Sequence, residues 1–320
     1  MKKIALFIIF SLALSGVSQA TILFQENFPD DNFHARGWYD GTGGATISTT
    51  EHASGSTSSY ECHFLAGATK CNLADSPLRM KFSPTSTIYV SFWVKHSSNW
   101  VGSGLSYHPH MFYILSSLDT EGSLPYFGDY SNLAWNYLDT YIEENQGKPV
   151  IAMQDGANVD LNNIGANLIG VTESRSIAGC NGTQTGIGQT SVDCYPVSTH
   201  YWDGMVWKGS TDYFVNGATK NQWHLVEALV SMNTVSGGIG QPDGSVKYWL
   251  DGNLEINHTN VIIRTGAHST MQFEQIVFGP FIGDGSPADQ YIWFDDLTVA
   301  TSRPTQGTAS LNPPTNFRLY

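Results

Sequence analysis

Residues able to transfer protons gather in one short segment, SYHPHMFYIL, which holds two histidines and two tyrosines. Histidine exchanges protons near neutral pH, and a phenol can donate a proton to a leaving oxygen. We therefore take His110 as a candidate general base, with His108 and Tyr113 as candidate ligand contacts. In a regular strand His110 shares a face with His108 but not with Tyr113, although Pro109 disturbs such a strand. The alternative interpretation is that both histidines are ordinary loop or rim residues.

Three more side chains complete the candidate catalytic set. Gln154 in VIAMQD supplies an amide, and Lys247 in GSVKYWL supplies a cation. Glu227 interrupts the apolar run LVEALV, where a buried carboxylate is costly unless it is paired or faces a wet groove. We predict that Glu227 and Lys247 are cross-strand neighbours on a groove floor that His110 also reaches. The alternative is a structural ion pair on a solvated sheet.

Tryptophan rings offer flat apolar surfaces on which the C–H faces of sugars pack. The candidates for ligand binding are Trp93, Trp202 and Trp249. Lys95 joins them because it shares the polar face of the alternating run IYVSFWVK with Trp93. For Trp93 and Trp249 the alternative is packing between sheets.

The four cysteines are more typical of disulfides than of a metal site. Four cysteines allow three pairings, and proximity in sequence favours Cys62–Cys71 and Cys180–Cys194. A zinc site is the alternative, but the spacing matches no CxxC framework.

The first twenty residues resemble a Sec-type signal peptide. Lys2 and Lys3 precede an apolar run, and Ser18-Gln19-Ala20 provides the small residues of a cleavage site. The run is shorter than the ~20 residues that span a bilayer. We expect cleavage after Ala20 and a secreted or periplasmic protein that is not integral to the membrane.

Composition narrows the classes of partner. Charged residues make up 13% of the chain, and 15 basic against 28 acidic residues give a net charge of −13. Such a surface repels phosphate backbones, so we expect no nucleic-acid partner. Neutral sugars stacked on aromatic side chains suit the composition better, since 12% of the residues are aromatic.

These candidate residues must be held by strands, because clear helical periodicity is absent beyond the signal peptide. The segments rich in β-branched and aromatic residues and bounded by turn residues are Ile88–Lys95, Met111–Ser116, Thr140–Glu144, Pro149–Gln154, Trp223–Met232, Ser245–Leu250, Met271–Phe278 and Tyr291–Ala300. Many strands without crossover helices predict antiparallel sheets in a sandwich or barrel.

Three segments resemble the concanavalin A-like lectin/glucanase superfamily. They are Asn221–Asn253, with its DGSVKYWLDG hairpin, the closing strand YIWFDDLTVA and the opening segment ILFQENFPDDNF. The resemblance implies an all-β, two-sheet antiparallel jelly-roll sandwich over residues 21–300, with a glycan lying across the concave sheet. A long loop insertion at 157–213 and a C-terminal tail at 301–320 complete the predicted organisation.

The resemblance leaves the activity open, because this superfamily includes lectins, glycosidases, polysaccharide lyases and adhesion modules. The ExDxE motif of its glucanase branch is absent, which argues against a glycosidase. The QIH or QVH triplet and the YFKAGxYxQ signature of its alginate lyases are absent as well. Related jelly rolls often carry a structural calcium ion, for which Glu26 and Asp296 are the ligands implied by position. No other cofactor is required.

We therefore expect a secreted carbohydrate-binding protein that recognises a polysaccharide. The enzymatic alternative is a lyase that cleaves a uronate-containing glycan by β-elimination. A structural or adhesion module is the third interpretation.

Overall fold

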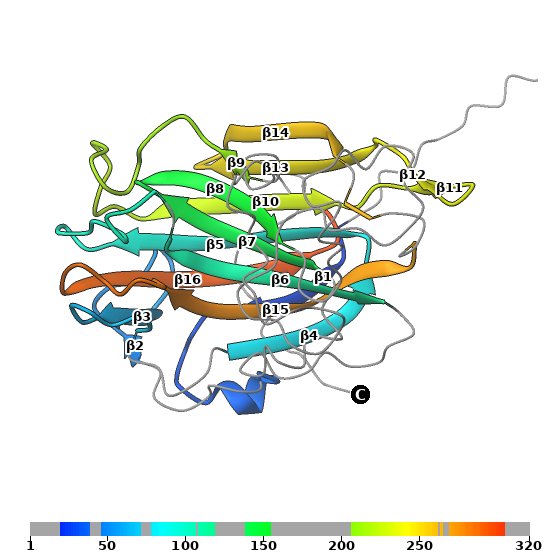
Figure 1. Ribbon diagram of the computed structural model, residues 1–320. Coiled ribbons are helices and arrows are strands. Elements are labelled where there is room, and N and C mark those ends of the chain that lie inside the picture. The colour runs from blue at the N-terminus through cyan, green and yellow to red at the C-terminus, as the bar shows by residue number, and fades with distance from the viewer. Residues whose placement is uncertain are drawn as a thin grey trace, which may run out of the picture.

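The computed structural model of the protein describes residues 20–38, 46–71, 78–106, 108–118, 138–154, 206–261, 263–264 and 269–304. Strands dominate these residues, and their only helix is the short 3-10 helix η1 (Phe33–Arg36) (Figure 1). The predicted signal peptide, most of the 157–213 insertion and residues 305–320 lie outside the described part.

The strands form two antiparallel sheets. In chain order they are β1 (Ile22–Glu26), β2 (Thr46–Ser48), β3 (Ser59–Phe64), β4 (Leu78–Thr85), β5 (Thr87–His96), β6 (His110–Leu118), β7 (Leu138–Asn145), β8 (Lys148–Gln154), β9 (Val206–Lys208), β10 (His224–Ser231), β11 (Val235–Ser236), β12 (Ile239–Gly240), β13 (Gly244–Leu250), β14 (Asn253–Val261), β15 (Met271–Phe281) and β16 (Gln290–Ala300). The larger sheet has the order β14-β13-β10-β5-β16-β3-β2, with β1 also paired to β16. The smaller sheet has the order β4-β15-β6-β7-β8-β9, and β11 and β12 form a separate hairpin.

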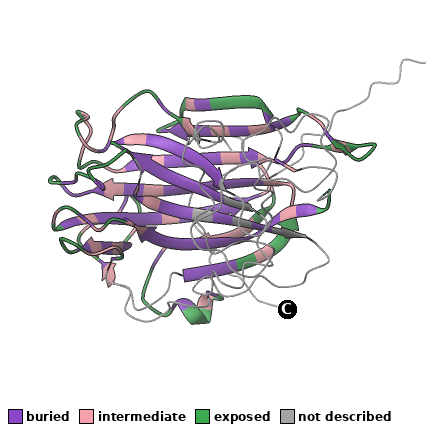
Figure 2. Cartoon of the chain, in the orientation of Figure 1, coloured by how far each residue is buried: buried purple, intermediate pink, exposed green. Residues whose placement is uncertain are grey.

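Alternation along β5 shows why the sheets face one another. Val90, Phe92 and Val94 are buried in the apolar cluster between the sheets, whereas Trp93 and Lys95 alternate with them and lie on the outer face. Most of the described residues in the central strands of both sheets are buried (Figure 2).

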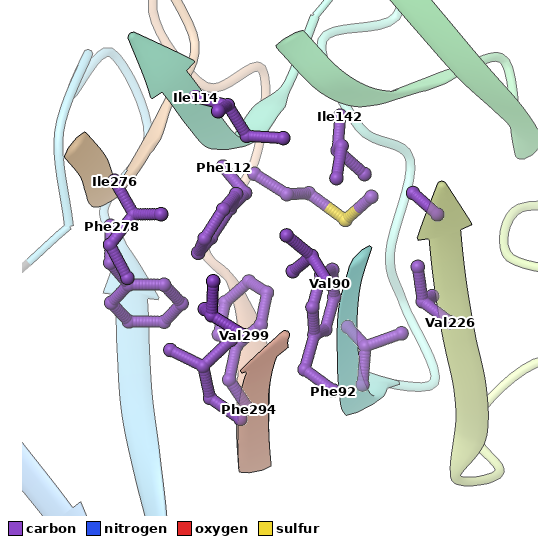
Figure 3. Packing of buried hydrophobic residues seen from close by; sticks show 14 of the residues in the cluster. Val90, Phe92, Phe112, Ile114, Ile142, Val226, Ile276, Phe278, Phe294 and Val299 are labelled. Atoms are coloured by element: carbon purple, nitrogen blue, oxygen red, sulfur yellow. The ribbon is translucent and has the colours of Figure 1, made fainter. Parts of the chain in front are cut away.

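The core is a single apolar layer to which both sheets contribute. Phe92 of β5 lies 6.0 Å from Phe112 of β6 and 5.7 Å from Phe294 of β16, measured between ring centroids (Figure 3). Burying one such side chain stabilises the fold by about 1.5–3 kcal/mol.

The path of the chain between the sheets confirms the predicted two-sheet antiparallel jelly-roll sandwich. Strands β3 and β5 belong to the larger sheet and β4 and β6 to the smaller one, and the last two strands are again divided between the sheets. β16 lies inside the larger sheet and pairs with β1, β3 and β5.

One predicted disulfide is confirmed. Cys62 on β3 is bonded to Cys71, nine positions later, and both are buried. The predicted Cys180–Cys194 bond lies outside the described residues.

Replacing both cysteines of this bond, Cys62→Ala with Cys71→Ala, should lower the free energy of unfolding by about 2–3 kcal/mol, because the unfolded chain gains the freedom of an open loop. Urea unfolding of the two oxidised proteins measures the difference. Non-reducing peptide mapping checks the pairing, and a Cys62–Cys180 peptide would contradict it.

Candidate functional site

The sequence-predicted site residues lie on two opposite sides of the molecule. Five are on strands β5, β10 and β13 of the larger sheet, where they alternate with residues of the apolar layer: Trp93, Lys95, Glu227, Lys247 and Trp249. Four belong to β6 and β8 of the smaller sheet or to the segment just before β6: His108, His110, Tyr113 and Gln154. The prediction that Glu227, Lys247 and His110 meet in one groove is therefore wrong, because the apolar layer separates them.

Glu227 has a different ionic partner from the predicted one. In the strand register it lies opposite Trp249, whereas Lys247 lies opposite Leu229. Arg303 donates to both carboxylate oxygens of Glu227, at 2.8 Å from Nε and 2.7 Å from Nη2, and the hydroxyl of Tyr89 donates at 2.7 Å. Burial, with the neighbouring carboxylate, raises the pKa of Tyr89 above its ordinary value. This arrangement is the structural ion pair of the alternative interpretation, with Arg303 in place of Lys247.

The ring faces on the outer side of the larger sheet are largely taken by the protein itself. The guanidinium of Arg303 lies 4.3 Å from the ring centroid of Trp249. Tyr291 and Trp293 stack on each other at 5.6 Å and 7°, and Nζ of Lys95 lies 5.8 Å from the Trp293 ring. These faces are therefore poor platforms for a sugar.

Trp93 and Lys95 are the other predicted ligand contacts on this face. The side chain of Trp93 is partly exposed, and Nζ of Lys95 lies 2.6 Å from Oε2 of Glu51. Trp202 lies outside the described residues.

The smaller sheet brings an imidazole and a carboxylate together. His110, the first residue of β6, pairs in register with Glu143 of β7, and its Nδ1 lies 2.6 Å from Oε1 of Glu143. The side chains are 13% and 5% exposed, respectively. The imidazole also stacks on the ring of Tyr141 at 4.3 Å and 23°. A carboxylate at one ring nitrogen orients a histidine, as in acid–base sites.

His108 lies beside this pair in its neutral form. Its ring centroid is 4.5 Å from that of His110, and Gly283 N–H donates to its Nδ1 at 3.1 Å, which places the remaining proton on Nε2. Burial, followed by repulsion from His110, lowers the pKa of His108 to about 4 against the opposing effects of Glu143 and Asp284. His108 therefore carries no charge at neutral pH.

Strand register aligns further polar residues with this pair. Tyr113 pairs with Tyr141 on one side and with Val277 on the other, and Val277 pairs with Arg79 of β4. Arg79 is fully buried in this row of the smaller sheet. The next row pairs Asp139 with Gln154. The side chains of Tyr113 and Gln154 are outside the described part of the structure.

The sequence did not identify Tyr141, Glu143 or Asp284 as candidates. Alternation within the predicted strand Thr140–Glu144 puts Tyr141 and Glu143 on one face. Only the register of β7 against β6 shows that this face meets His110.

The donors around Glu26 do not suit a calcium site. Arg36 Nε, Trp38 Nε1 and the N–H of Phe28 all donate to the Glu26 carboxylate, at 2.8, 2.7 and 2.8 Å. A guanidinium in this position competes with a cation for the same oxygens. Asp296 lies at a β-bulge of β16, and no group of three or more His, Cys, Asp or Glu among the described residues could hold a metal ion. A structural calcium ion at Glu26 and Asp296 therefore stays a prediction, and no step of the proposed function depends on it.

No protein-family profile and no curated protein matches the chain. Among solved structures it is similar to an alginate lyase from Aplysia kurodai, with 14% identity, a TM-score of 0.49, and coverage of 88% of this chain and 100% of the other. An alginate lyase from Chlorella virus is also similar, with 11% identity, a TM-score of 0.47, and coverage of 88% of this chain and 100% of the other. So is an endo-β-1,4-glucuronan lyase from Trichoderma reesei, with 11% identity, a TM-score of 0.46, and coverage of 88% of this chain and 96% of the other. Likenesses this distant carry no argument about activity. Within the described residues, no helix is long and apolar enough to cross a membrane.

The Glu227–Arg303 pair makes a stability prediction. Glu227→Gln should lower the free energy of unfolding by about 1–2 kcal/mol, because it removes the buried negative charge that pairs with Arg303. The loss is moderate because Arg303 is partly exposed to solvent. Lys247→Gln is the control and should change stability by less than about 0.5 kcal/mol. Equal losses in urea unfolding would show that Lys247, too, supports Glu227.

The lowered pKa of His108 makes a prediction about acid stability. The unfolded chain binds a proton at this residue below about pH 6.5, whereas the folded chain resists it down to about pH 4. Stability should therefore fall as the pH drops through this window, by up to about 3 kcal/mol from this residue alone. His108→Asn keeps an acceptor for Gly283 N–H but does not titrate, so its stability should decline less between pH 7 and 4. Parallel curves for the two proteins would contradict the assignment.

Proposed function

We propose that the protein is a polysaccharide lyase that cleaves a uronate-containing glycan by β-elimination. The observation that carries this proposal is the contact between Glu143 and His110, with the ring of Tyr141 stacked on the imidazole. Proton abstraction from carbon requires an oriented base, and a carboxylate 2.6 Å from an imidazole on the outer face of the smaller sheet orients one.

The reaction assigns a separate task to each group. His110 takes the C5 proton of the uronate, and Glu143 stabilises the imidazolium that results. The electrons of the C5–H bond form a C4=C5 double bond as the C4–O bond breaks, and a phenol protonates the departing oxygen. Tyr113, in register beside Tyr141, is the candidate for that phenol.

A uronate substrate suits the charge of this row of the sheet. Arg79 lies two strands from Tyr113, across β15, which corresponds to about 10 Å. Because Arg79 is fully buried, it would attract a uronate carboxylate through its field and not by contact, in a chain whose net charge is −13. The same positive charge would stabilise the negative charge that develops at C5.

The carbohydrate-binding interpretation draws less support from the structure. Of its tryptophan platforms Trp93, Trp202 and Trp249, Trp249 is covered by the guanidinium of Arg303, and only Trp93 is described with a partly exposed side chain. The polysaccharide partner and the secreted or periplasmic location remain part of the proposal, and the Cys62–Cys71 bond suits an oxidising compartment.

A panel of uronate-containing polysaccharides tests the proposal. Elimination produces an unsaturated uronate that absorbs at about 235 nm, and His110→Ala should lower its rate of formation by ~10²–10⁴-fold because the base is lost. His34→Ala is the control, since His34 is exposed on η1 and belongs to neither β6 nor β7.

Glycan binding without new absorbance across the whole panel would refute the lyase and return the carbohydrate-binding interpretation. Turnover that survives intact in His110→Ala would refute the assignment of the base.

A further inference from the structure

Glu143 is followed on β7 by a second carboxylate that points to the other side of the sheet. Glu144 is fully buried, and its Oε2 lies 2.9 Å from Nε2 of His96. Nε1–H of Trp100 donates to both of its oxygens, at 3.0 and 3.1 Å. The two neighbouring carboxylates thus have separate partners. Glu143 contacts His110 on the outer face of the smaller sheet, whereas Glu144 contacts His96 and Trp100 between the sheets.

The partners of Glu144 connect the two sheets. His96 is the last residue of β5 in the larger sheet, whereas Glu144 belongs to β7 in the smaller one. The rings of Trp100 and Phe214 lie 4.6 and 4.7 Å from the His96 ring and enclose the contact. A carboxylate at this depth is strongly destabilising without its partners, so Glu144 is confined to this position.

The main chain of Glu144 holds the segment that carries the candidate base. Its N–H donates to the carbonyl of Pro109 at 3.2 Å, and Pro109 lies between His108 and His110. One residue therefore fixes β7 through its side chain and the start of β6 through its backbone.

The loop before His108 is fastened at the same end of the sandwich. The side chain of Gln290 accepts from Val101 N–H at 2.8 Å and donates to the Gly102 carbonyl at 2.7 Å. The hydroxyl of Ser103 donates to the His108 carbonyl at 3.2 Å. The three residues that follow Trp100 are therefore all held by hydrogen bonds.

We propose that Glu144, held by Trp100 and His96, is the positioning residue of the Glu143–His110 pair. Side chains alternate along a strand, so a slip of β7 by one residue would exchange the faces of Glu143 and Glu144. The inner contacts of Glu144 prevent that slip and keep the Glu143 carboxylate at His110. The catalytic consequence rests on the lyase function proposed above, whereas the positioning itself does not.

Trp100→Phe tests the proposal, because it removes the indole N–H and retains an aromatic ring. We expect kcat to fall ~10–100-fold with KM changed less than ~threefold, since a displaced base loses its geometry while the glycan still binds. In the glycan-free full-length protein, the ring ¹⁵N chemical shifts of His110 should change as Glu143 moves. His110→Gln identifies the signal.

Trp38→Phe is a closely matched control. Trp38 is also fully buried and donates its indole N–H to a buried carboxylate, Glu26, at 2.7 Å. The Trp38→Phe variant loses the same kind of hydrogen bond at a position distant in sequence from His110 and Glu143. Its kcat and the His110 shifts should match those of the wild type.

Unchanged His110 shifts in Trp100→Phe would overturn the positioning role, as would equal changes in both variants, which would show general loosening. If Trp100→Phe does not fold, Glu144→Gln provides the same comparison by removing the charge while keeping the shape. If the wild type cleaves no glycan, the lyase function fails, but the NMR comparison still decides whether Glu144 positions His110.

Discussion

The structure depends on a single apolar layer that the strands of the two large sheets face with alternate side chains. This constraint sorts the polar residues of the chain into those turned outward and those forced inward. The inward ones are accepted only with partners: Glu144 has His96 and Trp100, and His224 has Asp251 at 2.7 Å and the Thr219 carbonyl at 3.1 Å. Both clusters lie at strand ends: His96 is the last residue of β5, and His224 is the first residue of β10. The site on the smaller sheet is the outward counterpart of the first cluster.

The strong strands were predictable because they fill this layer. Each segment chosen from its β-branched and aromatic residues overlaps an observed strand, from β5 to β16. The strands that the pattern missed include β2, β4, β9 and β14, which are edge strands of their sheets. An edge strand buries fewer residues and tolerates residues such as Pro84 in β4 or the polar run NLEINHTNV of β14, so its pattern is weak.

The candidate site was only partly predictable, and the limit was register and sheet membership. His110 was proposed from its chemistry, and the structure places the Glu143 carboxylate beside it. Lys247 and Glu227 were placed beside it because all three are polar residues in strand-like segments. Their segments carry no information about which sheet they join, and an offset of two residues in the β10–β13 register separates Lys247 from Glu227. Cys62–Cys71 was easier, because short separation along the chain sets the proximity by itself.

The place of β16 inside the larger sheet determines the order in which the protein can mature. Among the described residues β16 is the last strand, yet it pairs with β1, β3 and β5, whose residues emerge from the ribosome about two hundred or more positions earlier. Until it is synthesised, β3 and β5 each present an open edge, and the disulfide-bearing β3 has no neighbour on that side. Such edges recruit other chains, and pairings this distant in sequence form slowly. The larger sheet therefore closes only after β16 has been synthesised, which is compatible with an unfolded chain crossing a membrane before it folds.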